Sequence, residues 1–184
     1  RRMRASGVKL LDLTASNPTC CGFDYGPAPG QESILAPLLD PRALDYDPDP
    51  RGSLAARRAV CAYYREQGAP LDPEQLILTT STSESYSFLF RLLCDPGDEV
   101  LVAQPSYPLL EFLAQLDDVR LTPYGLLYDH GWQIDLATLE ERVSPRTRAI
   151  AVVHPNNPTG HFTKPGERTA LERVCRAHGL ALIV

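Results

Sequence analysis

Short apolar runs alternate with helical patterns over most of the chain after residue 75. The predicted elements, in order, are a strand at Leu76–Thr79, a helix at Thr82–Leu93, a strand at Glu99–Ala103, a helix at Leu109–Gln115, a strand at Val119–Leu121, a helix at Leu136–Val143, a strand at Ala149–Val153, a helix at Pro165–His178 and a strand at Leu180–Val184. Nearly continuous apolar strands that alternate with helices are typical of a parallel sheet covered on both faces. We therefore expect an α/β fold with a mostly parallel sheet.

The first part of the chain has a different pattern. Residues 14–53 are rich in Pro, Gly, Asp and Ser, with one short helical candidate near Ile34–Leu39. A clear amphipathic helix is then predicted over Leu54–Gln67. We expect residues 1–45 to form an irregular N-terminal segment and residues 46–184 a second region. The last apolar run reaches Val184 without a turn, so we expect the chain to be part of a longer protein.

The composition is that of a folded protein, and we expect neither a nucleic-acid nor a membrane partner. Of the 184 residues, 43% are hydrophobic and 22% are charged, and 18 basic against 23 acidic side chains give a net charge of −5. An acidic chain without a basic stripe is a poor partner for nucleic acid or anionic lipid. No apolar run approaches the roughly 18 residues that span a bilayer.

Cysteine and histidine usage indicates no metal site. The five cysteines are an odd number without a C-x-x-C pair, and they show no metal-binding spacing with the four histidines. This usage favours free thiols in a reducing, cytoplasmic compartment. His130, His161 and His178 are expected to be surface or capping residues.

A run of hydroxyl side chains lies between a predicted strand and a predicted helix. Residues Thr79 to Ser83 all carry hydroxyls. The start of a helix presents unpaired N–H groups and the positive end of its dipole, so the run is a candidate phosphate site. Simple N-capping is the alternative, because one hydroxyl is enough for a cap.

Two proline-rich loops follow predicted strands. Gln104 to Pro108 contains Tyr107, which can stack on a flat ring, and His154 to Gly160 contains Asn157, whose amide can donate to a ligand oxygen. Ligands of parallel sheets bind at the carboxyl ends of strands. The alternatives are a tyrosine that only packs and an ordinary turn.

The order of these motifs resembles the class I/II aminotransferases, which are pyridoxal 5'-phosphate (PLP) enzymes of fold type I. The motifs are Ser16-Asn17-Pro18, Tyr46-x-Pro-x-Pro-x-Gly52, the hydroxyl run, Asp95-Pro96-Gly97-Asp98, Pro105-Ser106-Tyr107-Pro108 and Asn157-Pro158-Thr159-Gly160. The likeness covers Leu10 to Val184 and corresponds to the N-terminal portion of a family member. It implies an incomplete PLP-binding large domain over residues 46–184, preceded by an arm or a part of the small domain.

The resemblance also implies roles for individual residues in binding the cofactor. Ser81, Thr82 and Ser83 correspond to the turn that holds the PLP phosphate. Tyr107 corresponds to the residue that stacks on the pyridine ring, and Asn157 to the asparagine that hydrogen-bonds its phenolic oxygen.

Further positions are implied for the partner subunit and the substrates. Tyr46 corresponds to a tyrosine that reaches the cofactor phosphate of the neighbouring subunit, which implies a homodimer. Ser16 and Asn17 correspond to a segment beside the substrate carboxylate. The implied substrates are an amino acid and a 2-oxo acid.

No catalytic residue is assigned within the chain. The family's Schiff-base lysine, its pyridinium carboxylate and its substrate-binding arginine are expected beyond residue 184, since the lysines present, Lys9 and Lys164, do not lie in the lysine motif. We expect residues 1–184 alone to be inactive. Alternatives are a PLP-dependent lyase or synthase of the same fold, and a non-catalytic PLP-domain regulator. A hydrolase using Ser83 and His154 would lack the G-x-S-x-G elbow.

Overall fold

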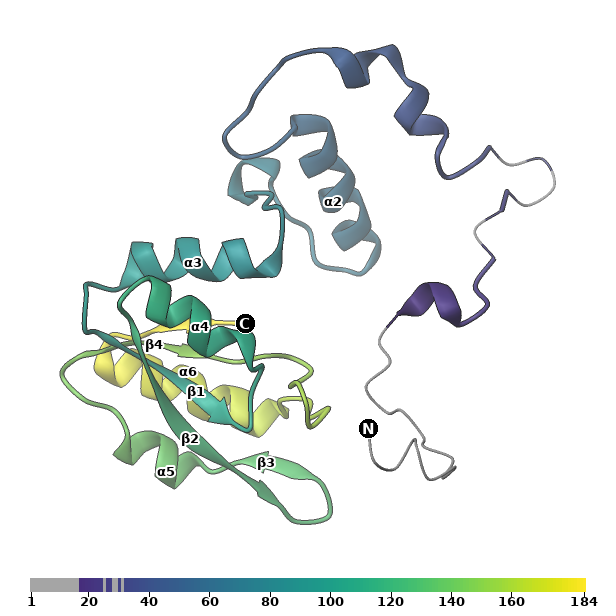
Figure 1. Cartoon of the computed structure of the whole chain (residues 1–184). Helices are drawn as coiled ribbons and strands as arrows, with labels where there is room; N and C mark the ends of the chain where they lie inside the picture. The colour runs from purple at the N-terminus through teal and green to yellow at the C-terminus, as the bar shows by residue number, and fades with distance from the viewer. Residues whose placement is uncertain (1–16, 25, 28–29, 31) are drawn as a thin grey trace, which may run out of the picture. The chain divides into compact units, whose positions relative to one another are not determined.

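The computed structural model describes residues 17–24, 26–27, 30 and 32–184, and the chain divides into two units, Arg1–Pro48 and Asp49–Val184 (Figure 1). The described part of the first unit holds three short 3-10 helices, η1 (Pro18–Cys20), η2 (Ala36–Leu39) and η3 (Pro41–Leu44). Each has a proline in its first two positions, where the missing N–H costs no hydrogen bond. The helix expected near Ile34–Leu39 is therefore a single 3-10 segment.

The second unit is built on a five-stranded sheet with the order β3-β2-β1-β4-β5. Its strands are β1 (Glu99–Gln104), β2 (Arg120–Tyr128), β3 (Trp132–Ile134), β4 (Thr147–Ala151) and β5 (Ala181–Ile183). All neighbouring pairs are parallel except β2 and β3, which form an antiparallel edge. The mostly parallel sheet predicted from the apolar runs is confirmed. Strand β3 was not predicted, because its three residues are too few to show a pattern.

Helices cover both faces of this sheet (Figure 1). They are α3 (Thr82–Leu93) and α4 (Leu109–Leu116) on one face, and α5 (Leu136–Glu141) and α6 (Pro165–His178) on the other; α2 (Leu54–Glu66) precedes them in the chain. The predicted bounds of α3 and α6 are confirmed. Gly179, with φ of 66°, ends α6 in the left-handed conformation that glycine adopts without strain.

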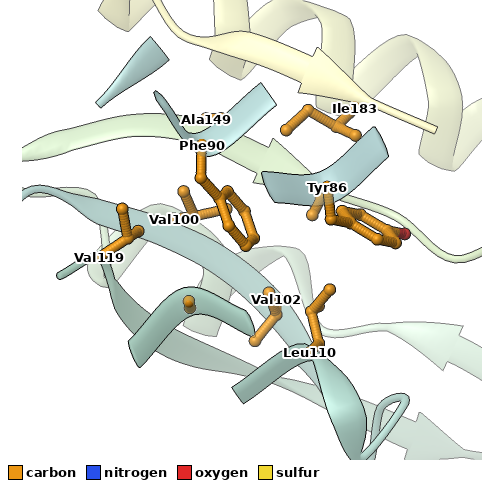
Figure 2. Packing of buried hydrophobic residues seen from close by; sticks show 10 residues of the cluster. Tyr86, Phe90, Val100, Val102, Leu110, Val119, Ala149 and Ile183 are labelled. Atoms are coloured by element: carbon orange, nitrogen blue, oxygen red, sulfur yellow. The ribbon is translucent and has the colours of Figure 1, made fainter. Parts of the chain in front are cut away.

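Side chains on the central strands alternate between two apolar cores. Val100 and Val102 of β1 pack with Tyr86 and Phe90 of α3 (Figure 2). The intervening Leu101 packs against α5 and α6. Strand β4 alternates in the same way, so both central strands are buried on both faces.

The strand predicted at Leu76–Thr79 does not form in the described chain. The segment is extended, and Leu78 N donates to Arg51 O at 2.9 Å, but no strand lies beside it among the described residues. A strand needs a neighbouring backbone with which to pair, and this requirement is not visible in a four-residue apolar run.

Residues 49–81 are organised around a buried guanidinium. Arg57 on α2 is 1% exposed; its Nη2 donates to Asp49 Oδ2 at 2.9 Å, and its Nε donates to Gly52 O at 3.0 Å. Its Nη1 donates to Pro73 O at 2.7 Å, at the start of η4 (Pro73–Gln75). Gly52 has φ of 86°, and a Cβ there would lie 2.7 Å from Leu78 Cβ, so only glycine fits this turn.

None of the helices in the described ranges is long and apolar enough to cross a bilayer.

Candidate functional site

The connections that follow β1 and β4 indicate which edge of the sheet binds a ligand. The two strands are parallel neighbours, and β1 leads to α4 on one face while β4 leads to α6 on the opposite face. Loops that leave neighbouring strands in opposite directions open a crevice at the carboxyl ends of those strands. The crevice between β1 and β4 is therefore the candidate site.

The first turn of α3 lies at the same edge of the sheet. Helix α3 ends at the turn Cys94–Asp98, which leads into the start of β1, so the helix runs back across the sheet against the direction of that strand. Its N-terminal half packs near the carboxyl ends of the strands: Tyr86 belongs to the same core as Val102 and Ile183 (Figure 2). The hydroxyl run at the start of α3 is thus placed at the ligand-binding edge.

Part of the hydroxyl run is used within the protein. Ser81 is the N-cap, and its Oγ accepts from Glu84 N at 3.2 Å. Thr79 Oγ1 lies 2.7 Å from Ser85 Oγ. The hydroxyls of Thr82 and Ser83 make no hydrogen bond within the part of the chain that is described, so the first turn of α3 still offers two hydroxyl donors beside its free N–H groups.

The carboxylate of Glu84 is held away from those N–H groups. Its Oε2 accepts from Thr80 N at 2.7 Å and from Thr80 Oγ1 at 3.0 Å. The negative charge is therefore satisfied on the residue before the cap, and the N–H groups of Thr82 and Ser83 stay available to an external anion.

Tyr107 lies beside the first turns of α3. It is half-buried and packs against the core that contains Tyr86. Burial raises the pKa of Tyr86, and the neighbouring Tyr107 raises it further. Tyr107 also lines a groove of about 810 Å³ that runs along α4 and β2; Ser81, Thr82, Ser83 and Asn157 do not line this groove.

The two strand-end loops are joined by Asn156, which the sequence reasoning missed. Asn157 is exposed, and its side chain has no hydrogen-bond partner among the described residues. The side chain of Asn156 is buried instead, and its Nδ2 donates to Pro105 O at 3.2 Å, in the loop that carries Tyr107. The only signal in the sequence was a second asparagine in the same proline-rich loop.

The base of the Asn157 loop is fixed by a buried His161, which corrects the prediction of a surface or capping residue. His161 is 8% exposed, and its Nε2 lies 3.1 Å from Glu167 Oε2. Glu167 accepts from Ile134 N and Lys164 N, both at 2.7 Å. The carboxylate beside the buried imidazole comes from the first turn of α6, which follows the loop directly in the chain.

The Ser83–His154 hydrolase alternative has no geometric support. His154 Nδ1 accepts from Thr163 N at 3.2 Å, and its ring packs edge-on against Phe162. Ser83 and His154 share no hydrogen bond in the described structure. No group of three or more potential metal ligands occurs among the described residues either.

The remaining predicted site residues belong to the first unit or lie outside the described residues. Ser16 lies outside them. Asn17 is exposed, and its Oδ1 accepts from Thr19 N at 3.1 Å and from Thr19 Oγ1 at 2.6 Å. Tyr46 is 94% exposed. The loops that carry Tyr107 and Asn157 are therefore joined within the second unit, whereas Asn17 and Tyr46 belong to the first unit.

The family model for aminotransferase class I and II matches residues 31–184. The chain belongs to this family. Among curated relatives, alanine aminotransferase of Mycobacterium tuberculosis is 36% identical over 186 residues. The match covers 99% of this chain and 42% of the relative. Glutamate-pyruvate aminotransferase AlaA of Escherichia coli is 30% identical over 99% of this chain and 44% of its own length.

Solved structures of the family share the fold described above. Alanine aminotransferase from Pyrococcus furiosus aligns with a TM-score of 0.81 and 26% identity, over 98% of this chain and 46% of that one. The chain therefore spans less than half the length of the relatives it matches.

Proposed function

We propose that the protein is a PLP-dependent aminotransferase, which transfers an amino group between an amino acid and a 2-oxo acid. The observation that carries this proposal is the crevice between β1 and β4, where a loop with an aromatic ring and a loop with a free amide are joined through the Asn156–Pro105 hydrogen bond. The start of α3, with its uncommitted hydroxyls, lies at the same edge. Membership of the family supports the same conclusion.

The residues present fit the phosphate of PLP. The donors at the start of α3 are the N–H groups and hydroxyls of Thr82 and Ser83, together with the hydroxyl hydrogen of Ser81, whose oxygen alone is engaged with Glu84. Such a set satisfies several phosphate oxygens at once, and the helix dipole adds to it. Those three residues would hold the phosphate.

The ring of PLP would be held by the two strand-end loops. Tyr107 offers an aromatic face that is fixed by packing against the core, and Asn157 offers an exposed amide that can donate to the phenolic oxygen. When bound, PLP supplies an electron sink for the carbanion formed at the amino acid. The described residues bind and orient the ring.

The lysine that bonds PLP is proposed to lie outside residues 1–184. Lys9 and Lys164 are the lysines of the chain, and Lys164 precedes α6 as its N-cap, outside the two loops and the α3 turn. The pyridinium carboxylate and the substrate arginine belong to the same proposal. We also propose a homodimer, with Tyr46 directed to the partner's cofactor.

We propose alanine and glutamate, with their oxo acids, as the substrates. Both curated relatives described above and the Pyrococcus structure are named for alanine or for glutamate and pyruvate. Glutamate carries a side-chain carboxylate on a longer stem, which alanine lacks, and an arginine elsewhere in the protein would recognise it.

The test uses the full-length protein with PLP, L-alanine and 2-oxoglutarate. Pyruvate and glutamate are expected to form in equal amounts, with no ammonia, and residues 1–184 alone are expected to show no turnover above free PLP. Ammonia release that does not depend on the oxo acid would indicate a lyase and would overturn the proposal, as would PLP binding without any turnover across a panel of amino acids.

A further inference from the structure

Asn156 makes hydrogen bonds to both loops of the candidate site. Its side chain is 5% exposed, and Nδ2 donates to Pro105 O at 3.2 Å and to Thr159 Oγ1 at 2.9 Å. Pro105 belongs to the loop after β1, which carries Tyr107. Thr159 belongs to the loop after β4, which carries Asn157. One amide group therefore connects the two loops that flank the crevice.

The orientation of this amide is determined by its partners. The carbonyl of Pro105 can only accept, so the nitrogen of Asn156 and not its oxygen must face it. Thr159 Oγ1 accepts from His161 N at 3.3 Å as well. The backbone of Asn156 is also engaged: its N donates to His161 O at 2.8 Å, and its O accepts from Gly160 N at 2.7 Å.

The remaining polar atom of the side chain is left without a partner. Asn156 Oδ1 is buried and has no donor among the described residues. A buried acceptor without a donor opposes folding, whereas an apolar side chain of similar size would fill the same space without that cost. Stability alone therefore does not account for an asparagine at this position, but a geometric requirement does.

We propose that Asn156 is a positioning residue that fixes Tyr107 and Asn157 relative to one another at the crevice between β1 and β4. This inference rests on the proposed function, in which those two residues hold the cofactor ring. Without the amide, the loops after β1 and β4 leave the sheet in opposite directions with no side-chain hydrogen bond between them in the described chain. The ring of Tyr107 and the amide of Asn157 are then no longer held in a fixed distance and orientation relative to each other.

The experiment compares full-length wild-type protein with N156A, N156D and T163A. N156D keeps the shape of the side chain but places a carboxylate oxygen against the carbonyl of Pro105, so the link is broken at constant volume. T163A is the matched control, because it alters the same loop region without touching an atom of the link. Thr163 N donates to His154 Nδ1, and the Thr163 hydroxyl makes no hydrogen bond to the described residues. PLP is titrated by its absorbance, and the pH midpoint of the visible band of bound PLP is measured.

The expected result is a PLP dissociation constant about 10- to 100-fold higher in N156A and N156D, because the contacts of the ring with Tyr107 and Asn157 weaken and each contributes roughly tenfold to affinity. The pH midpoint of the bound band is expected to move in both variants, and T163A is expected to match the wild type. If N156A does not fold, N156D decides the question, because it removes the donor to Pro105 O while it keeps the volume of the side chain.

Two failures are distinguishable. Wild-type protein that binds no PLP would overturn the proposed function. Wild-type protein that binds PLP, together with folded Asn156 variants that have unchanged affinity and an unchanged pH midpoint, would overturn the positioning role alone.

Discussion

Two parts of the second unit are stabilised by opposite kinds of interaction. Residues 82–184 are organised by two apolar cores on the faces of the sheet, in which Phe90, Leu101 and Ile150 are fully buried. Residues 49–81 are organised by the buried guanidinium of Arg57 and its carboxylate and carbonyl partners.

The difference shows which interactions can be anticipated from local patterns. Apolar alternation repeats at fixed spacing, so the sheet and its helices are visible in the sequence. The partners of Arg57 are Asp49, Gly52 and Pro73, which have no periodic relation to it. A buried charge of this kind is recognisable only when the chain has brought its partners together.

The largest effect is expected from truncation in the apolar part. Phe90→Ala removes a ring that is fully buried beside Val100 (Figure 2), and it should lower the free energy of unfolding by about 3–5 kcal/mol. Phe88→Ala is the control on the same helix, because Phe88 is 47% exposed. Urea unfolding of the full-length protein measures both. Equal losses would contradict the assignment of Phe90 to the core.

Arg57→Ala tests the polar part. Removal of the guanidinium leaves the carbonyls of Gly52 and Pro73 and the Oδ2 atom of Asp49 without this donor, and we expect a loss of about 3 kcal/mol. Amide exchange should become faster in residues 49–81 and stay slow in β1. Arg58→Ala is the control, since Arg58 is exposed and forms no ion pair in the described chain. Faster exchange throughout the sheet would show that the two parts do not differ as described.

Variants of two hydroxyl residues at the start of α3 distinguish an effect on stability from an effect on ligand binding. Ser81→Ala removes the N-cap and should cost about 1 kcal/mol of unfolding free energy. Ser83→Ala removes a hydroxyl that has no hydrogen-bond partner among the described residues, so the free energy of unfolding should change by less than about 0.5 kcal/mol while PLP affinity falls about tenfold. Urea unfolding and PLP titration of the full-length variants measure the two effects. Unchanged PLP affinity in Ser83→Ala would remove this hydroxyl from the phosphate site.

The smallest expected effect is a pH dependence at the opposite end of the sheet. A hydrogen bond from Asp95 N, and then Arg148, lower the pKa of Asp98 below its ordinary 3.8. Because the folded-state pKa is the lower one, Asp98 contributes stability above pH 3.8 that is lost as the pH falls through the folded-state pKa.

Asp98→Asn should therefore flatten the decline of the melting temperature below pH 4, with Asp118→Asn, an exposed neighbour, as the control. Melting curves at pH 7, 5 and 3.5 provide the measurement. If the melting temperature of Asp98→Asn declines as steeply as that of the wild type, other groups dominate acid unfolding.

The sequence by itself determined the α/β architecture, the bounds of α3 and α6, and the order of motifs that points to the family. These features depend on contacts between residues that are close in the chain or on repeated patterns. The tertiary structure alone decided three others: Leu76–Thr79 has no strand beside it, His161 is buried against Glu167, and Asn156 joins the loops after β1 and β4. A strand needs a neighbouring backbone and a buried polar side chain needs a polar neighbour, and no repeated pattern in the sequence specifies either, so both are decided in the folded protein.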